Sequence, residues 1–89
     1  MRAVILYHPK SEQAGPAENF KREFESRHHG KKIELVSLET VEGSEMAKLY
    51  DIVRYPAILV IALDGSLQKL WQDQPWPLMD EVYSYSSAG

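Results

Sequence analysis

Apolar residues in this chain gather in short runs that predict four β-strands. Continuous apolar runs at residues 3–7 and 57–63 are typical of strands that are buried on both faces of a sheet. Apolar residues are also frequent at 31–38, which predicts another strand. The segment 67–71 mixes polar and apolar residues, so we expect its strand at an edge of the sheet.

The segments between these runs predict three helices. Apolar residues recur three and four positions apart at 12–27 and 45–53, the spacing that gives a helix one buried side. Ser11 and Ser44 belong to the residue types that cap a helix N-terminus, so we expect them to cap these two helices. A third helix is expected at 77–85, with proline at its first position. The expected buried residues of the first two helices are Ala17, Phe20, Phe24, Met46, Leu49, Tyr50 and Val53.

Prolines and glycines indicate where these elements begin, bend or turn. Pro16 is expected to kink or restart the first helix, because proline lacks the N–H group that a helical hydrogen bond needs. Proline is tolerated at the first position of a strand, and Pro56 directly precedes an apolar run. We expect the Tyr55-Pro56 peptide bond to be cis. Asp64-Gly65 predicts a hairpin turn in which both residues have positive φ.

The predicted elements follow the order βαβαββα. This order predicts an α/β fold, in which one four-stranded mixed sheet is flanked by helices on both faces. The 89 residues of the chain, 1–89, are enough for one small domain with a single core.

The chain resembles the thioredoxin superfamily in this element order and in several local motifs. Tyr7, His8-Pro9-Lys10-Ser11 and Pro16 fall on the family pattern of an aromatic residue, an active-site motif and a downstream proline. The first and last residues of the motif take the two cysteine positions. The segment 49–56 is similar to the stretch that leads to the family's cis-proline, and Asp64-Gly65 is similar to its hairpin turn. The resemblance implies a thioredoxin-like fold over nearly the whole chain.

The chain departs from the family where the family's redox chemistry takes place. It contains no cysteine, and thiolate is the nucleophile of disulfide exchange. The strand at 3–7 also lacks the buried acidic residue that thioredoxins carry there. The resemblance therefore implies a fold and a binding groove without dithiol–disulfide activity.

The resemblance also implies where this groove lies. In the superfamily, the backbone before the cis-proline pairs with an extended substrate or with glutathione, and here that residue is Tyr55. The expected ligand-binding or peptide-binding residues are Tyr7, His8, Ser11, Tyr55 and Pro56. Because histidine changes its charge near neutral pH, His8 is expected to make the affinity pH-dependent.

Three functions remain open at this point. The first is a non-redox module that binds a protein or peptide in the cis-proline groove by strand addition. The second is a relative of the glutathione transferases in which Ser11 serves a bound thiolate, although the acidic-serine pair of those enzymes is missing after Asp64. The third is a structural or assembly domain, such as a dimer formed through the edge of the third strand. Trp71 and Trp76 either cover the core or contribute to a partner surface.

Composition and sequence features argue against several other classes of partner and ligand. A net charge of −3 argues against nucleic acid, whose binding proteins are basic. No apolar segment reaches the length of a membrane span and no signal sequence is recognisable, so we expect a cytoplasmic protein without a membrane partner. The adjacent His28 and His29 would point in different directions at a helix end, so no metal site is expected. No cofactor is expected either.

Overall fold

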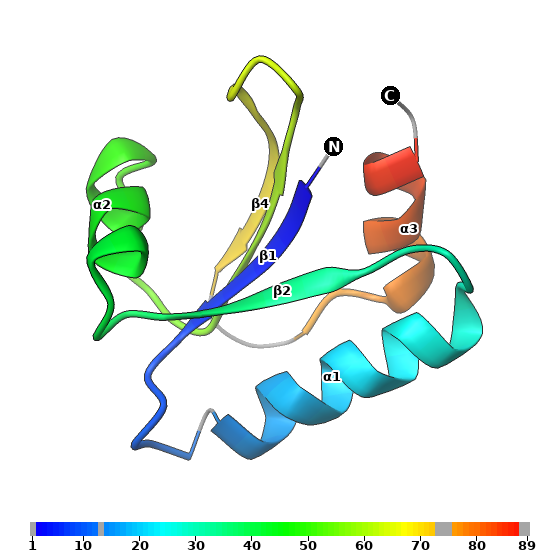
Figure 1. Cartoon of the computed structure of the whole chain (residues 1–89), viewed down its shortest axis with the longest axis horizontal. Coiled ribbons are helices and arrows are strands. Elements are labelled where there is room, and N and C mark those ends of the chain that lie inside the picture. The colour runs from blue at the N-terminus through cyan, green and yellow to red at the C-terminus, as the bar shows by residue number, and fades with distance from the viewer. Residues whose placement is uncertain (1, 13, 73–75, 88–89) are drawn as a thin grey trace.

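The structure of the chain, a computed structural model, describes residues 2–12, 14–72 and 76–87 (Figure 1). Its element order is βαβαββα, as predicted. The elements are β1 (Arg2–Tyr7), α1 (Ala14–Arg27), β2 (Ile33–Ser37), α2 (Val41–Leu49), β3 (Ala57–Ile61), β4 (Leu67–Gln72) and α3 (Met79–Ser87).

The four strands form one mixed sheet in the order β2-β1-β3-β4. β1 pairs in parallel with β2 and antiparallel with β3, and β3 pairs antiparallel with β4. The predicted edge position of β4 is confirmed. β3 has a neighbour on each side, so it offers no free edge for the dimer that was considered as one alternative. The exposed edges of this sheet belong to β2 and β4.

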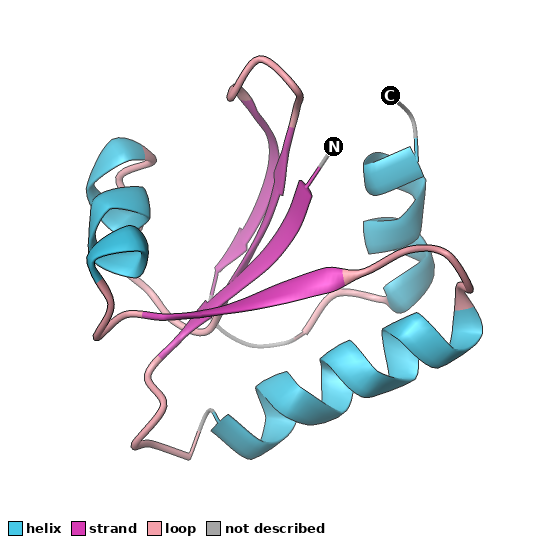
Figure 2. Ribbon diagram, viewed as in Figure 1, coloured by secondary structure: helices cyan, strands magenta, loops and turns pink. Residues whose placement is uncertain are grey.

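Helices cover both faces of the sheet, as Figures 1 and 2 show: α1 and α3 lie on one face and α2 on the other. Alternating residues of each strand point to opposite faces and thereby divide the core in two. The cluster on the α1/α3 face contains Ala3, Ile5, Ala17, Phe20, Phe24, Ile33, Ile58 and Val82. The cluster on the α2 face contains Val4, Leu6, Val36, Met46, Ile52, Ala57, Leu59 and Ile61.

The first helix begins later than the sequence predicts. α1 starts at Ala14, so Ser11 is not its N-cap and the prediction is wrong on this point. Pro16 is then the third residue of the helix, in the first turn, where a backbone N–H has no helical acceptor. A proline there neither breaks a hydrogen bond nor kinks the helix, and α1 runs without interruption to Arg27.

The second helix begins and ends about four residues earlier than predicted. Thr40, rather than Ser44, is its N-cap, because the Thr40 hydroxyl oxygen accepts the Gly43 N–H at 3.0 Å. Gly43, which the sequence suggested as part of a loop, lies inside the helix and is buried. A Cβ atom at Gly43 would lie only 2.1 Å from the Ser37 carbonyl oxygen, so glycine lets α2 approach the end of β2.

Because α2 ends earlier than predicted, two residues that were expected to be buried are exposed. The helix ends at Leu49, and Asp51 has a positive φ of 54°, a conformation that closes many helices at this position. Of the four residues expected on the buried side, Met46 is buried and Tyr50 is half-buried. Leu49 and Val53 are 72% and 73% exposed, contrary to the prediction.

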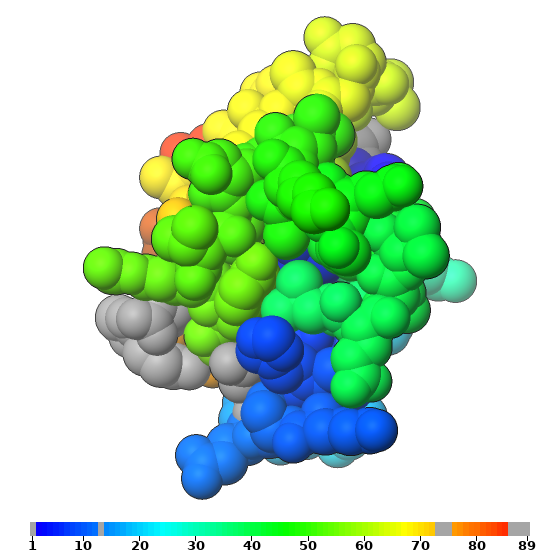
Figure 3. Space-filling model, turned by 90° about the vertical axis from the view of Figure 1, so that its left-hand side faces the viewer, coloured from blue at the N-terminus to red at the C-terminus, as the bar shows by residue number. Residues whose placement is uncertain are grey.

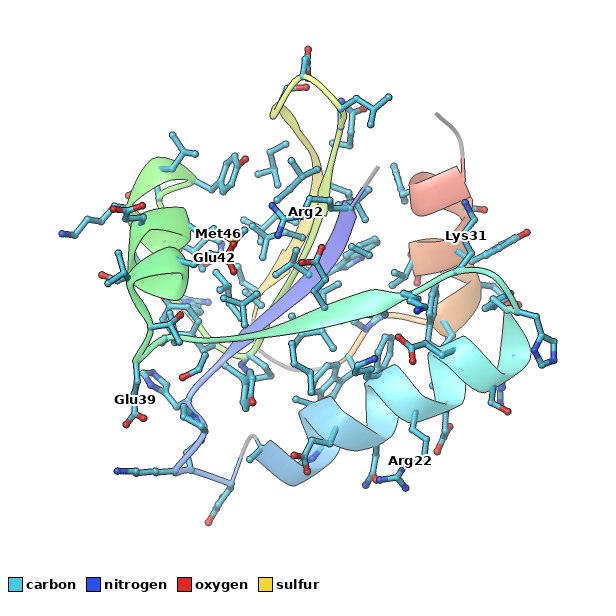
Figure 4. All side chains as sticks on the ribbon, viewed as in Figure 1. Arg2, Arg22, Lys31, Glu39, Glu42 and Met46 are labelled. Carbon is cyan, nitrogen blue, oxygen red and sulfur yellow. The ribbon has the colours of Figure 1, made fainter. Side chains whose placement is uncertain are left out.

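An ion-pair cluster joins α2 to the sheet near the start of β1. The Arg2 guanidinium donates two hydrogen bonds to the Glu34 carboxylate, at 2.8 and 2.9 Å, and lies 3.8 Å from Glu42 of α2. Figure 4 shows Glu42 and Met46 on the side of α2 that faces Arg2. The hydrogen bonds from Arg2 lower the pKa of the Glu34 carboxyl below its ordinary value.

The remaining turns agree only in part with the predictions. The Tyr55-Pro56 peptide bond is cis. Gly65 has a positive φ of 90°, but Asp64 does not have a positive φ, and the connection spans residues 62–66 rather than two residues. The Asp64 carboxylate instead accepts hydrogen bonds from the backbone N–H and the hydroxyl of Ser66. α3 begins at Met79, two residues after the expected Pro77.

Candidate functional site

The ends of β1 and β3 bring His8 and Tyr55 together. Leu6 pairs with Ala57 in the antiparallel register, so two residues further along the two segments come His8 and Tyr55. Their ring centroids are 5.2 Å apart and the rings meet edge to face, at 76°. Figure 3 shows the segment after β1, in blue, beside the green segment before β3 on this side of the molecule. Two residues 47 positions apart in the sequence thus form one surface.

Tyr55 is only half exposed on this surface. Its hydroxyl donates a 2.8 Å hydrogen bond to the Ile52 carbonyl oxygen, and its ring packs against the core cluster on the α2 face. Burial raises the pKa of the Tyr55 hydroxyl. Tyr55 therefore also stabilises the loop between α2 and β3, so its replacement by alanine would lower stability as well as remove an exposed ring.

Tyr7 lies on the other side of the sheet from this pair. It packs against the core cluster on the α1/α3 face, whereas Tyr55 packs against the cluster on the α2 face. The structure therefore does not place the Tyr7 ring on the same face of the sheet as the Tyr55 ring. The sequence contained the signal, because Ala3, Ile5 and Tyr7 alternate along one strand and share a face.

Ser11 lies close to His8 but does not have the geometry of an activated nucleophile. Its side chain is exposed, and its hydroxyl donates a 2.7 Å hydrogen bond to the backbone carbonyl oxygen of His8. A nucleophilic serine gives this proton to a base in the reaction. Ser11 also precedes the start of α1 by three residues, so it does not lie at the helix N-terminus as expected.

Pro56 shapes the surface without being exposed on it. The residue is buried and directly precedes β3, whose five residues are all buried. Of the five predicted site residues, the structure thus brings the His8 and Tyr55 rings into contact and joins Ser11 to the His8 backbone by a hydrogen bond, while Pro56 is buried. Tyr7 is half-buried and packs against the core cluster of the α1/α3 face.

Gln72, at the end of β4, is a residue of this region that the sequence did not indicate. Its side-chain oxygen Oε1 accepts the backbone N–H of Val53 at 3.1 Å and that of Arg54 at 3.2 Å. Gln72 pairs with Ala57 in the sheet, which places its side chain beside the loop before Pro56. An exposed glutamine on an edge strand gives no sequence signal of such a contact, because the contact depends on the β3–β4 register.

The other polar cluster of interest lies between α1 and α3. His28 stacks on Tyr83 with centroids 4.1 Å apart, and its buried Nε2 atom lies 3.5 Å from the Asp80 carboxylate. His29, in contrast, is exposed. Across residues 2–12, 14–72 and 76–87, no three histidine, aspartate or glutamate side chains gather in a way that could hold a metal ion.

The helices in the described part of the chain are too short or too polar to cross a membrane. No protein-family model matches the sequence, and no curated protein is significantly similar to it. The resemblance to thioredoxins therefore depends on this chain's own motifs and on an element order that is compatible with that fold.

Proposed function

We propose that this chain is a non-redox, thioredoxin-like module that binds an extended peptide segment of a partner protein at the surface of His8, Ser11 and Tyr55. The observation that carries the proposal is the contact between the His8 and Tyr55 rings in front of Pro56. The resemblance to thioredoxins implies a binding groove at this place, and the chain has no cysteine for redox chemistry.

The chemistry of the surface suits a peptide. His8 is exposed and combines a flat apolar ring with two nitrogen atoms for hydrogen bonding. Tyr55 adds a half-exposed aromatic ring that its hydrogen bond to Ile52 holds in place. Rigid aromatic side chains lose little conformational entropy on binding, and they are frequent among the residues that dominate binding energy.

The alternative functions receive less support from this geometry. A glutathione site would use the Ser11 hydroxyl at a helix N-terminus, but Ser11 precedes α1 and donates to a backbone oxygen. A purely structural role would not require an exposed His8 ring in a fixed orientation. The contact with Tyr55 gives the ring such an orientation.

Selection from a phage-displayed library of random linear dodecapeptides would test the proposed function. We expect the wild-type chain to select peptides whose affinity falls by about fivefold or more in His8→Ala, as loss of an anchoring side chain costs about 1 kcal/mol or more. His29→Ala is the matched control, because His29 is an exposed histidine at the far end of α1. Tyr55→Phe, which keeps the ring, should retain more affinity than Tyr55→Ala.

Two outcomes would contradict the proposal. One is that repeated selections enrich no peptide over a blank surface. The other is that the selected peptides bind His8→Ala and wild type equally well, while unfolding curves show that both proteins are folded.

A further inference from the structure

Two successive backbone N–H groups converge on one oxygen atom directly before Tyr55. The donors belong to Val53 and Arg54, and the acceptor is Oε1 of Gln72, at 3.1 and 3.2 Å. All three residues are exposed. The acceptor comes from a different segment of the chain, the last position of β4, so this pair of donors does not belong to the hydrogen-bond ladder of the sheet.

Such a pair of donors is chemically suited to an anionic oxygen. Successive N–H groups that point to one spot form a small concave site of positive partial charge, which binds anions. Hydrogen bonds to a carboxylate are about twice as strong as those to a neutral amide oxygen. The amide of Gln72 is therefore a weaker occupant of this site than a carboxylate would be.

The surroundings of the two donors add a positive charge and an apolar contact. Arg54 carries an exposed guanidinium group that forms no ion pair with any residue the structure describes. Val53 is 73% exposed, so its side chain is accessible for an apolar contact. A ligand that places a carboxylate on the two N–H groups would therefore find a cation and an apolar surface beside it.

We propose that the backbone of Val53 and Arg54 is a carboxylate-binding site, which Gln72 occupies in the free protein and leaves when a ligand arrives. The carboxylate comes from the peptide partner, either from its C-terminus or from an acidic side chain. The identity of this ligand as part of a peptide rests on the proposed function, because the site adjoins Tyr55. The N–H groups themselves bind the carboxylate whatever it is attached to.

NMR titration of the whole chain with small carboxylates tests the site without a known partner. The probes are N-acetyl-leucine for a C-terminal carboxylate, N-acetyl-aspartic acid α-amide for a side-chain carboxylate, and N-acetyl-leucinamide as the neutral control. We expect one of the two carboxylates to shift the amide signals of Val53 and Arg54 at millimolar concentration, and the neutral amide to leave them unchanged. The carboxylate that binds more tightly identifies the source.

Substitutions of Gln72 test its part in the proposal. Gln72→Ala empties the site, so we expect carboxylate affinity to rise by about two- to tenfold and amide exchange at Val53 and Arg54 to become faster. Gln72→Glu supplies an internal carboxylate, so binding of the probes should be lost and exchange at both amides should slow. Gln68→Ala is the matched control, because Gln68 is an exposed glutamine on the same strand whose amide donates to Ser66.

The results separate this inference from the proposed function. Equal shifts with N-acetyl-leucinamide, or no shift of the two amides with either carboxylate in Gln72→Ala, would overturn the carboxylate site. If the carboxylates bind as expected while peptide selection shows no dependence on His8, the carboxylate site is supported and the proposed peptide-binding surface is contradicted. Arg54→Gln should reduce carboxylate affinity by about two- to tenfold, since it removes the neighbouring positive charge.

Discussion

On one face of the sheet, aromatic rings fill the space between helices and strands, whereas on the other face a helix backbone lies directly against a strand end. On the α1/α3 face, Phe24 is fully buried, and Phe20 stacks on Trp76 with ring centroids 5.1 Å apart. His28 continues this aromatic packing and stacks on Tyr83 of α3. These helices are therefore held by large side chains.

On the α2 face, small and polar groups add to the contacts of the apolar core cluster. Gly43 brings the helix backbone against the Ser37 carbonyl, and Arg2 connects Glu34 of the sheet with Glu42 of the helix. The aromatic residues of this face, Tyr50 and Tyr55, lie at its rim, where their hydroxyls donate to backbone carbonyl oxygens. The two faces should therefore be sensitive to opposite kinds of substitution.

Removal of a large side chain should have its greatest effect on the α1/α3 face. We expect Phe24→Ala to lower the free energy of unfolding by about 3–5 kcal/mol, because it leaves a cavity at the centre of the aromatic cluster. Urea denaturation followed by circular dichroism measures this loss, and Glu23→Ala, at the exposed neighbouring position, is the control. A loss below about 1 kcal/mol for Phe24→Ala would mean that α1 does not depend on this ring.

Addition of a small group should have its greatest effect on the α2 face. Gly43→Ala places a methyl group within 2.1 Å of the Ser37 oxygen, so we expect a loss of about 2–3 kcal/mol in the free energy of unfolding. Gly15→Ala is the matched control, because a Cβ atom there meets no atom within 4 Å. This control should raise stability by about 0.5–1 kcal/mol, since alanine favours the helix more than glycine does. Equal effects of the two substitutions would contradict the close approach of α2 to β2.

The ion pair on the α2 face should make a smaller contribution that depends on pH. Arg2 lowers the pKa of Glu34 below its ordinary 4.5, so the stabilisation is present above pH 4.5 and is lost as the pH falls through the lowered value. Both side chains are partly exposed, and we expect Glu34→Gln to cost less than about 1 kcal/mol at pH 7. Urea denaturation at pH 7 and pH 3 should show this difference shrinking at the lower pH. A difference of the same size at both values, or one equal to that of the exposed Glu23→Gln, would exclude a contribution from this pair.

Apolar patterns predicted the four strands and the first two helices, and Pro77 indicated the third helix. These features depend on local patterns, in which a run such as 57–63 requires burial and the spacing of Phe20 and Phe24 requires a helix with one buried side. The edge position of β4 followed from its mixed polarity in the same way. Such patterns lie within short segments of the chain, so they can be recognised in the sequence without knowledge of the structure.

The boundaries of the helices required tertiary information. Thr40 and Ser44 are both good capping residues, and the sequence offers no local reason to prefer one. The contact of Gly43 with the end of β2 selects Thr40, because it requires the glycine to be inside the helix. The burial of Met46 and the exposure of Leu49 follow from that choice.

The sequence by itself determined the arrangement of layers and the absence of cysteine, because these depend on composition and on local apolar spacing. Only the tertiary structure decided which candidate residues meet. The antiparallel register of β1 and β3 places His8 beside Tyr55, and strand alternation sends Tyr7 to the opposite face. The register of β3 and β4 brings Gln72 to the backbone of Val53. Contacts between residues far apart in the chain depend on how strands pair, and no local pattern specifies that pairing.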